Sequence, residues 1–203
     1  MILRISGKLA AMLLLGGMLA GCIDADVDVA VTSATTARAT MTQTMGAEFY
    51  SMLKMDAEQA ADGEAANEDE FCADGMLTEN ADGTATCVMT EEGAFADLKM
   101  GDDKPSVFFT AAGPGLVRIA LPTAAMKSEI GADESMDEET QKMVEAFFAG
   151  HSISLRFSGA EVTETNMTLS ADKTAAETKI KFLDLIQGTA ELPDEFFAIV
   201  RVP

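Results

Sequence analysis

A cysteine stands at the end of the most apolar segment of the chain. Arg4 and Lys8 precede an apolar run over residues 9–19, and two small residues then lead to Cys22. A short basic stretch, an apolar run and a small-residue cleavage site together indicate a secretory signal peptide. The run is too short to cross a bilayer, which takes about 20 apolar residues. We therefore expect an exported chain in which the Cys22 thiol is a candidate for modification; an ordinary signal peptide with no role for Cys22 is the alternative.

The segment Leu19-Ala20-Gly21-Cys22 resembles the lipobox of bacterial lipoproteins. The resemblance covers residues 1–22 and implies cleavage before Cys22, a lipid on its thiol and an acylated new N-terminus. Several acyl chains would make the anchor durable, because each buried CH₂ contributes about 0.8 kcal/mol and one chain alone holds weakly. We expect residues 1–21 to be a lipoprotein signal peptide and residues 22–203 to be a single lipid-anchored domain that faces the periplasm. Ile23 after the cysteine favours the outer over the inner membrane, by analogy with known sorting.

The other two cysteines, Cys72 and Cys87, predict a disulfide. An even number of remaining cysteines in an exported chain is typical of such a bond. Joining these two would close a loop of about 15 residues and contribute on the order of 3 kcal/mol to stability. A metal or redox site is the alternative, but the sequence has neither Cys-x-x-Cys spacing nor a histidine close by.

The side chains that enzymes use do not form a recognisable set. The sequence contains no Gly-x-Ser-x-Gly and no His-Glu-x-x-His segment. Its one histidine, His151, follows Gly150, with neither an orienting acid nor a nucleophile apparent in the sequence. A histidine at the surface or on an edge strand is therefore favoured. Paired carboxylates, as in glycoside hydrolysis, stay open because 34 acidic side chains single out no pair. We expect a protein that is not an enzyme and has no cofactor.

Three aspartates could bind a cation. Asp24, Asp26 and Asp28 fall on one face of an alternating segment, and their oxygens suit Ca²⁺. Side chains two apart on a strand fan out along the face rather than converge. A solvated face is therefore favoured, and no metal site is expected.

Methionine is the one enriched residue type, with 14 in the chain. Thioethers bind Cu(I), and Met41, Met45, Met52 and Met55 lie close together in the sequence. Copper carriers of this kind usually cluster Met with His, whereas here Met45 and Met52 share an apolar stripe at helical spacing. Packing in the core is therefore favoured.

The charge balance restricts the partners. The 203 residues carry 34 acidic and 14 basic side chains, a net charge of −20, and two of the basic residues lie in the expected signal peptide. A chain this acidic repels nucleic-acid phosphates and anionic headgroups, so no nucleic-acid partner is expected. No other apolar stretch approaches the length of a membrane span, which leaves the acyl chains as the expected membrane attachment.

The elements that would position these residues are mostly strands. Strict alternation of apolar and polar residues predicts a half-buried strand at residues 23–31, directly after Cys22. Asp82-Gly83 suits a hairpin turn that would bring Cys72 and Cys87 together. Further strands are predicted at residues 37–42, 105–110, 116–121, 151–157, 162–169, 178–182 and 196–202.

Three helices are predicted. One begins near Ala47, where apolar residues follow helical spacing. Thr90, followed by two glutamates, indicates the N-cap of a second, and Ser135 opens a capping box for a third that ends at Gly150. Because the strands cluster in adjacent runs, we predict an α+β domain. Its sheet would be mainly antiparallel and curved, with about three short helices on one face.

Phenylalanine occurs in three tandem pairs, at residues 108–109, 147–148 and 196–197. Neighbours in a strand point to opposite faces. One ring of the first and last pairs must therefore leave the core, toward a covering helix, a groove or a partner. A covering helix is favoured, although interiors rich in Met and Phe also accommodate flexible apolar ligands.

Residues 22–31 and the strand-rich later half resemble the LppM-like lipoproteins. That group combines a lipobox, an alternating Asp-bearing strand directly after it, and a curved sheet domain associated with lipid or glycolipid binding. Members also have a C-terminal transmembrane segment, which is not found here. The resemblance implies a non-catalytic binding module for a lipid, glycolipid or other amphiphile of the cell envelope, and it transfers no binding residue. A structural or accessory subunit of an envelope protein complex is the alternative.

Overall fold

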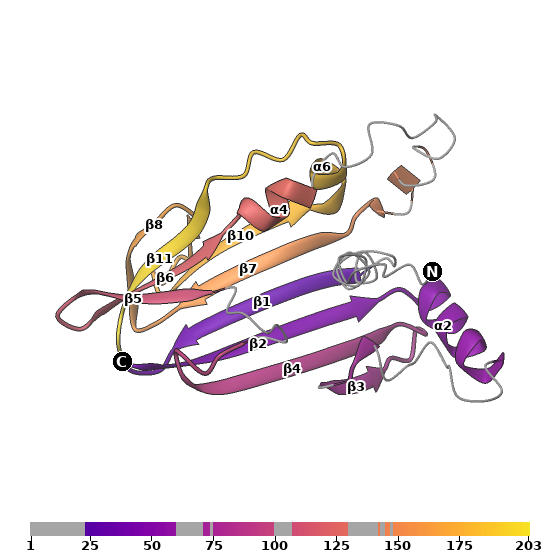
Figure 1. The fold of residues 1–203 in the computed structure, drawn as a ribbon, viewed down its shortest axis with the longest axis horizontal. Helices are drawn as coiled ribbons and strands as arrows, with labels where there is room; N and C mark the ends of the chain where they lie inside the picture. Colours follow the sequence, from indigo (N-terminus) through magenta and orange to yellow (C-terminus); the bar gives the residue numbers. More distant parts are fainter. Residues whose placement is uncertain are drawn as a thin grey trace, which may run out of the picture.

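The alternation along residues 23–31 turns Val29 and Val31 into the core and the aspartates to the other face of a strand. The computed structural model describes residues 23–59, 71–73, 75–99, 107–129, 142, 145–146 and 148–203. Its strands form two sheets whose inner faces share one hydrophobic core (Figure 1). The chain was expected to form one curved sheet, and it forms a larger and a smaller one instead.

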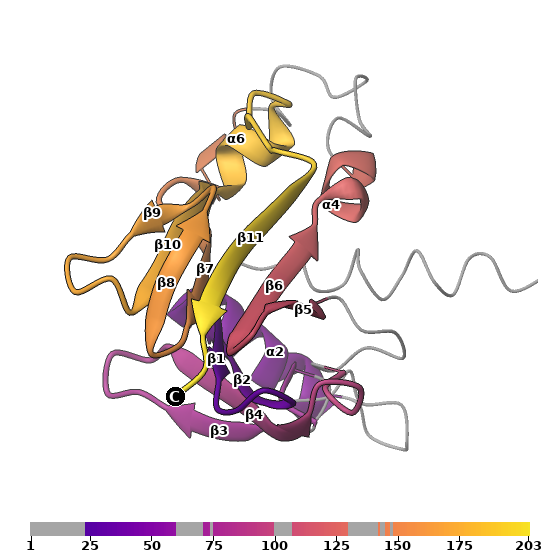
Figure 2. The same cartoon turned by 90° about the vertical axis from the view of Figure 1, so that its left-hand side faces the viewer.

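The larger sheet has seven strands, and all neighbours are antiparallel except β1 and β7, which are parallel. Figure 2 shows this sheet turning from β9 and β10 round to β4 and β3, with β6 and β11 of the smaller sheet on its inner side. In sheet order the strands are β3 (Met76–Glu79), β4 (Ala85–Ala94), β2 (Thr36–Met45), β1 (Ile23–Val31), β7 (Ser152–Ser158), β10 (Ala175–Lys181) and β9 (Thr168–Leu169).

The smaller sheet has four antiparallel strands. In order they are β5 (Phe108–Gly113), β6 (Leu116–Pro122), β11 (Glu195–Arg201) and β8 (Glu161–Thr165). The predicted strand at 162–169 is divided, because β8 joins the smaller sheet while β9 joins the larger one. Gly113 and Gly115 both have positive φ at the β5–β6 turn, as a tight turn there requires.

The core lies between the two sheets. Phe157 of β7, Ile119 of β6 and Val200 of β11 are fully buried. Burying a side chain of this kind stabilises a fold by about 1.5–3 kcal/mol. The shared core therefore holds the two sheets together.

One predicted helix is wrong. The segment after Thr90 continues β4, and Thr90 lies opposite Thr40 of β2 in a ten-residue antiparallel ladder. Arg38 reinforces this pairing through an ion pair of 2.6 Å with Glu92. Pairing along the whole of β2 has overridden the local capping signal.

The helix predicted near Ala47 is confirmed as α2 (Ala47–Gln59), whose Tyr50 packs with Met45 and Ala85 in a second, smaller apolar cluster. Two short helices were not predicted, α4 (Ala124–Glu129) and α6 (Phe182–Ile186). Counting helices of six or more residues, the described part of the chain has two. The expectation of about three on one face is therefore corrected.

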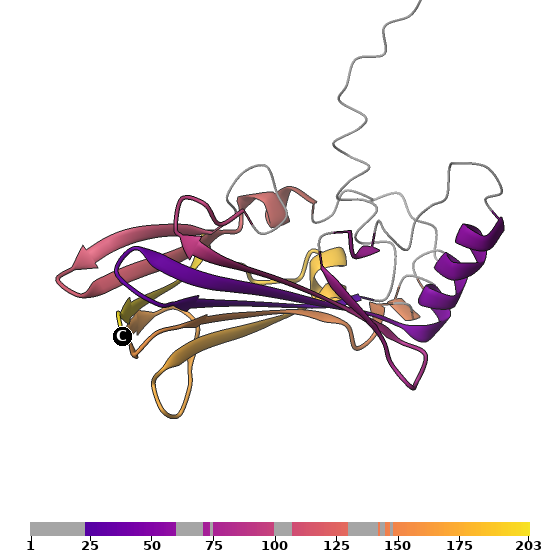
Figure 3. The ribbon, with the colours of Figure 1, turned by 90° about the horizontal axis from the view of Figure 1, so that it is seen from below.

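The helix predicted after Ser135 lies largely outside the described residues; positions 142, 145–146 and 148 are described, and they are helical. In the part of the chain that the structure describes, no helix is long and apolar enough to cross a membrane. Figure 3 shows α2 at the opposite end of the molecule from the C-terminus.

Candidate functional site

Over β1, β7 and β10 the outer face of the larger sheet is polar. The pairing of β1 with β7 and of β7 with β10 places Asp26, Ser154 and Lys179 in one row across three strands. In the described part of the chain, neither Asp26 nor Lys179 makes an ion pair. The row thus offers a carboxylate, a hydroxyl and an ammonium group to a ligand.

The next row is held together by Arg156. Its Nη1 donates to Asp28 Oδ2 at 2.8 Å, and its Nε donates to Glu177 Oε1 at 3.1 Å. The hydrogen bond to Asp28 is the largest cause that raises the pKa of Arg156, ahead of Glu177. The guanidinium is therefore permanently charged and fixed between two strands.

These two rows line a depression of about 510 Å³ over β1, β7, β9 and β10. Volumes of this order are common among ligand sites. The polar groups that line it are Asp26, Asp28, Ser154, Arg156, Thr168, Glu177, Thr178 and Lys179. These side chains can bind a ligand that has an anionic part and, beside it, a cationic or hydroxyl part.

His151 and Asp24 lie beside the depression, at the start of β7 and β1. His151 Nδ1 is 3.2 Å from Asp24 Oδ2, so the structure supplies the acidic neighbour that is not apparent in the sequence. The Ser152 backbone N–H and hydroxyl both contact Asp24 Oδ1, at 2.9 and 3.4 Å. Because Ser152 turns to the aspartate rather than to the imidazole, these three groups do not form a nucleophile–base–acid relay.

The predicted disulfide is present. Cys72 and Cys87 are joined with a Cα–Cα distance of 5.6 Å, and β3 pairs with β4 as the hairpin prediction required. Gly83 has φ +86° at the turn. Cys22 lies outside the described residues, so its lipidation stays a prediction.

The three aspartates of β1 do not converge. Asp24 faces His151 and Asp28 faces Arg156, whereas Asp26 has no such partner within the described ranges of the chain. Among the described residues, no group of three or more His, Cys, Asp or Glu side chains could hold a metal ion.

The methionines have two different environments. Met45 is buried in the cluster with Tyr50, as core packing requires. Met52 and Met55 are 55% and 52% exposed, so the prediction that Met52 faces the core is wrong.

The tandem phenylalanines divide between faces as predicted. Phe196 is buried, whereas Phe197 lies outside the core beneath Arg118, whose guanidinium carbon is 4.6 Å from the ring centre. Phe109 stacks on Phe95 at 4.3 Å, and Phe108 is 48% exposed. Residue 147 lies outside the described residues. The ring centres of Phe148 and Phe182 are 5.9 Å apart.

Arg156 and Lys179 are the candidate binding residues that sequence reasoning missed. Alternation alone places each on the polar side of its own strand. Their approach to Asp26 and Asp28 depends on the parallel β1–β7 pairing of strands 128 residues apart. No local pattern in the sequence encodes that pairing.

Comparisons with known proteins give one likeness. No protein-family model matches the chain, and no curated protein matches it. Among solved structures, the chain is similar to the folded domain of LppM from Mycobacterium tuberculosis, determined by NMR. The identity is 13%, the match covers 90% of this chain and 91% of that one, and the TM-score is 0.47. That protein belongs to the group that residues 22–31 resemble. At this distance the likeness transfers neither residue roles nor function.

Proposed function

We propose that this protein is an acylated envelope lipoprotein whose domain binds, without catalysis, the polar headgroup of a lipid, glycolipid or other envelope amphiphile. The proposed site is the polar depression on the larger sheet. One observation carries the proposal: β1, which forms a wall of the depression, begins at the residue after Cys22. Asp26 follows Cys22 by four residues, a span of at most about 14 Å. An anchor at Cys22 would therefore hold the depression near the headgroup layer.

The charges of the depression favour a zwitterionic or hydroxyl-rich headgroup. Lys179 and Arg156 would donate to phosphate or hydroxyl oxygens. Asp26 would accept from an ammonium or hydroxyl group. A purely anionic ligand is disfavoured, because the net charge of the chain is −20. The Met and Phe content of the sequence favoured contact with the acyl chains of a lipid. Because the depression is lined by polar groups, we propose contact with the headgroup instead.

Native mass spectrometry tests this proposal directly. The chain with Cys22→Ser, exported to an oxidising periplasm, is expected to carry a lipid-sized adduct or to bind dihexanoyl-phosphatidylethanolamine in a calorimetric titration. The double variant R156Q/K179Q should weaken that binding about tenfold or more. The matched control is R201Q, because Arg201 of β11 makes a comparable exposed ion pair with Glu161 of β8, outside the depression. An adduct-free protein that binds neither this probe nor its phosphatidylglycerol equivalent contradicts the proposal.

An accessory role in an envelope complex is the second candidate. It is favoured by Phe108, which is 48% exposed on β5, one of the two edge strands of the smaller sheet. Phe108, Ala120 and Phe197 form one row across three strands, and an edge strand carries backbone groups free to pair with another chain. A photo-crosslinker at position 108 should capture one reproducible envelope protein in intact cells. Crosslinks to no consistent partner would count against this role.

A further inference from the structure

Several elements begin or end beside the first residue of β1. Ile23 pairs with Met45, the last residue of β2, and α2 starts two residues later. Asp24 binds the Ser152 backbone N–H at the start of β7, and the Phe182 N–H at the start of α6 donates to the His151 carbonyl. These contacts define one end of the molecule, which we call the anchor end.

The anchor end has almost no spacer from Cys22. Consecutive Cα atoms are about 3.8 Å apart, and the described strand begins one residue after the cysteine. The headgroup layer of one leaflet is roughly 5–8 Å thick. Acyl chains on Cys22 would therefore bring the start of β1 into the headgroup layer itself.

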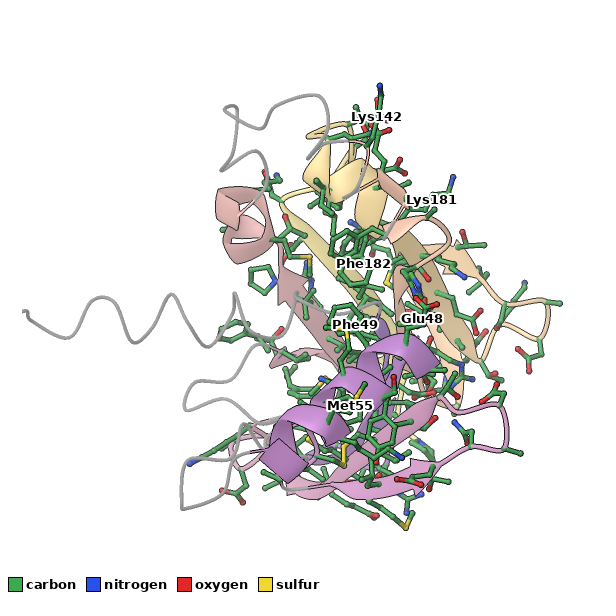
Figure 4. All side chains as sticks on the ribbon, turned by 90° about the vertical axis from the view of Figure 1, so that its right-hand side faces the viewer. Glu48, Phe49, Met55, Lys142, Lys181 and Phe182 are labelled. Atoms are coloured by element: carbon green, nitrogen blue, oxygen red, sulfur yellow. A yellow bond between two sulfur atoms is a disulfide. The ribbon has the colours of Figure 1, made fainter. Side chains whose placement is uncertain are left out.

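The surface of the anchor end has the composition of an interfacial surface. Met52 and Met55 are three residues apart on α2, which places them on one side of the helix, and both are more than half exposed. Figure 4 looks onto this end, with α2 and Met55 below and Lys181 and Lys142 above. Both lysines are exposed. Exposed apolar side chains combined with lysines are typical of surfaces that lie on a bilayer.

Two of the acidic groups at this end have stabilising neighbours, and α2 also carries Asp56 and Glu58. Glu48 lies in the first turn of α2, where the helix dipole stabilises a negative charge. Asp24 accepts a hydrogen bond from the Ser152 backbone N–H at 2.9 Å. Lys142 and Lys181 make no ion pair with another described residue. They are therefore available to lipid phosphates, although the chain as a whole is strongly acidic.

We propose that the anchor end docks on the bilayer that holds Cys22, with α2 lying against the headgroups and its Met52 and Met55 side chains inserted among them. The inference rests on the proposed lipid anchor. It adds an orientation: the strands point away from the membrane, and the polar depression lies close above the headgroups, since Asp26 is at most about 14 Å from Cys22. A tethered surface needs little affinity of its own, because the tether keeps its local concentration high.

Hydrogen exchange on the acylated protein tests this orientation. The full chain is expressed with its own leader, its intact mass is measured, and it is reconstituted in vesicles of phosphatidylethanolamine and phosphatidylglycerol. The reference is the Cys22→Ser protein mixed with the same vesicles. Amides of α2 should exchange about fivefold more slowly in the acylated protein, and the turn at Gly113–Gly115, at the far end, should not change.

The variant M52S/M55S should lose most of this protection. The matched control is Leu169→Ser, because Leu169 is 41% exposed on β9, opposite Ala176 and away from the anchor end. Ten Gly and Ser residues inserted between Cys22 and Ile23 should also abolish the protection. An unacylated mass overturns the anchor and, with it, the docking. An acylated mass with unchanged exchange in α2, or with protection at the Gly113–Gly115 turn, overturns the docking alone.

Discussion

Asp172 is held in the turn between β9 and β10 by its neighbours. The Ser170 hydroxyl donates to its carboxylate at 2.7 Å, and the Thr174 backbone N–H and hydroxyl donate at 3.1 and 2.9 Å. These bonds, the one from Ser170 most of all, lower the pKa of Asp172 from 3.8 to about 2. The charged carboxylate is therefore part of the turn.

We expect this turn to depend on acidity only below about pH 4. The pKa is lower in the folded than in the unfolded chain, so the carboxylate contributes stability above pH 4. That contribution is lost as the pH falls through about 2. An NMR titration should give a midpoint near 2 for the Asp172 side chain, and D172N should remove this pH dependence. A midpoint near 4 would contradict the hydrogen bonds from Ser170 and Thr174 to this carboxylate.

Gly159 lies where the chain passes from the larger to the smaller sheet. A Cβ at this position would be 2.8 Å from Val200 Cβ and 2.9 Å from the Arg201 carbonyl oxygen. Gly159→Ala should therefore lower the free energy of unfolding in urea by about 1–3 kcal/mol. The control is Gly93→Ala on β4, where a Cβ meets nothing within 4 Å. Equal effects of the two substitutions would refute this assignment.

Individual residue environments were predictable where sequence neighbours create them. The alternating aspartates and the split phenylalanine pairs follow from strand geometry alone. The exposure of Met52 was not predictable, because α2 turns Tyr50 and Leu53 to the cluster with Met45 instead. The His151–Asp24 contact was not predictable either, because it depends on the pairing of β7 with a strand that is distant in sequence.

At the scale of elements, the β3–β4 hairpin is fastened by the Cys72–Cys87 disulfide. β3 is the outermost strand at one edge of the larger sheet, and its residues are exposed. It pairs with β4 alone, so little burial stabilises it. The covalent link between the hairpin and Cys72 compensates for this.

Removing the disulfide should destabilise the protein by about 3 kcal/mol, because the cysteines are 15 residues apart and the open chain gains loop entropy. Urea unfolding of C72A/C87A against the oxidised protein measures this difference. Adding a reductant should reproduce it in the native chain and leave the variant unchanged. If reduction leaves the unfolding midpoint of the native protein unchanged, the disulfide is not a determinant of stability.

Strands whose partners follow directly in the chain were predictable. β1 with β2, β3 with β4, and β5 with β6 are each joined by a short turn, and all three pairs are antiparallel, in line with the mainly antiparallel sheet that was predicted. The helix predicted after Thr90 failed for the opposite reason, because the partner of this segment lies 50 residues earlier in the chain. Its capping residues are real local signals, but β2 is long enough to hold the segment in a sheet ladder.

At the scale of the whole molecule, one core joins the two sheets, and Phe157 is central to it. This ring on β7 is fully buried in the same cluster as Ile119 and Val200 of the smaller sheet. Phe157→Ala should lower the free energy of unfolding by about 3–5 kcal/mol. Exchange protection should then fall in β10 and β11 together. Loss in β10 with full protection kept in β11 would mean that the sheets unfold separately.

The arrangement of the two sheets could not be predicted from sequence patterns. Alternation identifies a buried face but does not name the sheet that covers it, so residues 162–169 read as one strand although β8 and β9 belong to different sheets. The same limit hid the polar depression, whose walls come from both ends of the chain.

The position of β1 between β2 and β7 also constrains how the chain assembles. β2 follows β1 through a short turn and can pair at once, whereas the residues of β7 lie 128 positions further along. Until then the second edge of β1 carries unpaired backbone groups, and closing so long a loop is slow. The second edge of β1 can therefore pair only after residues 152–158 have been synthesised. A chain arrested earlier would present an open β-edge to chaperones and proteases.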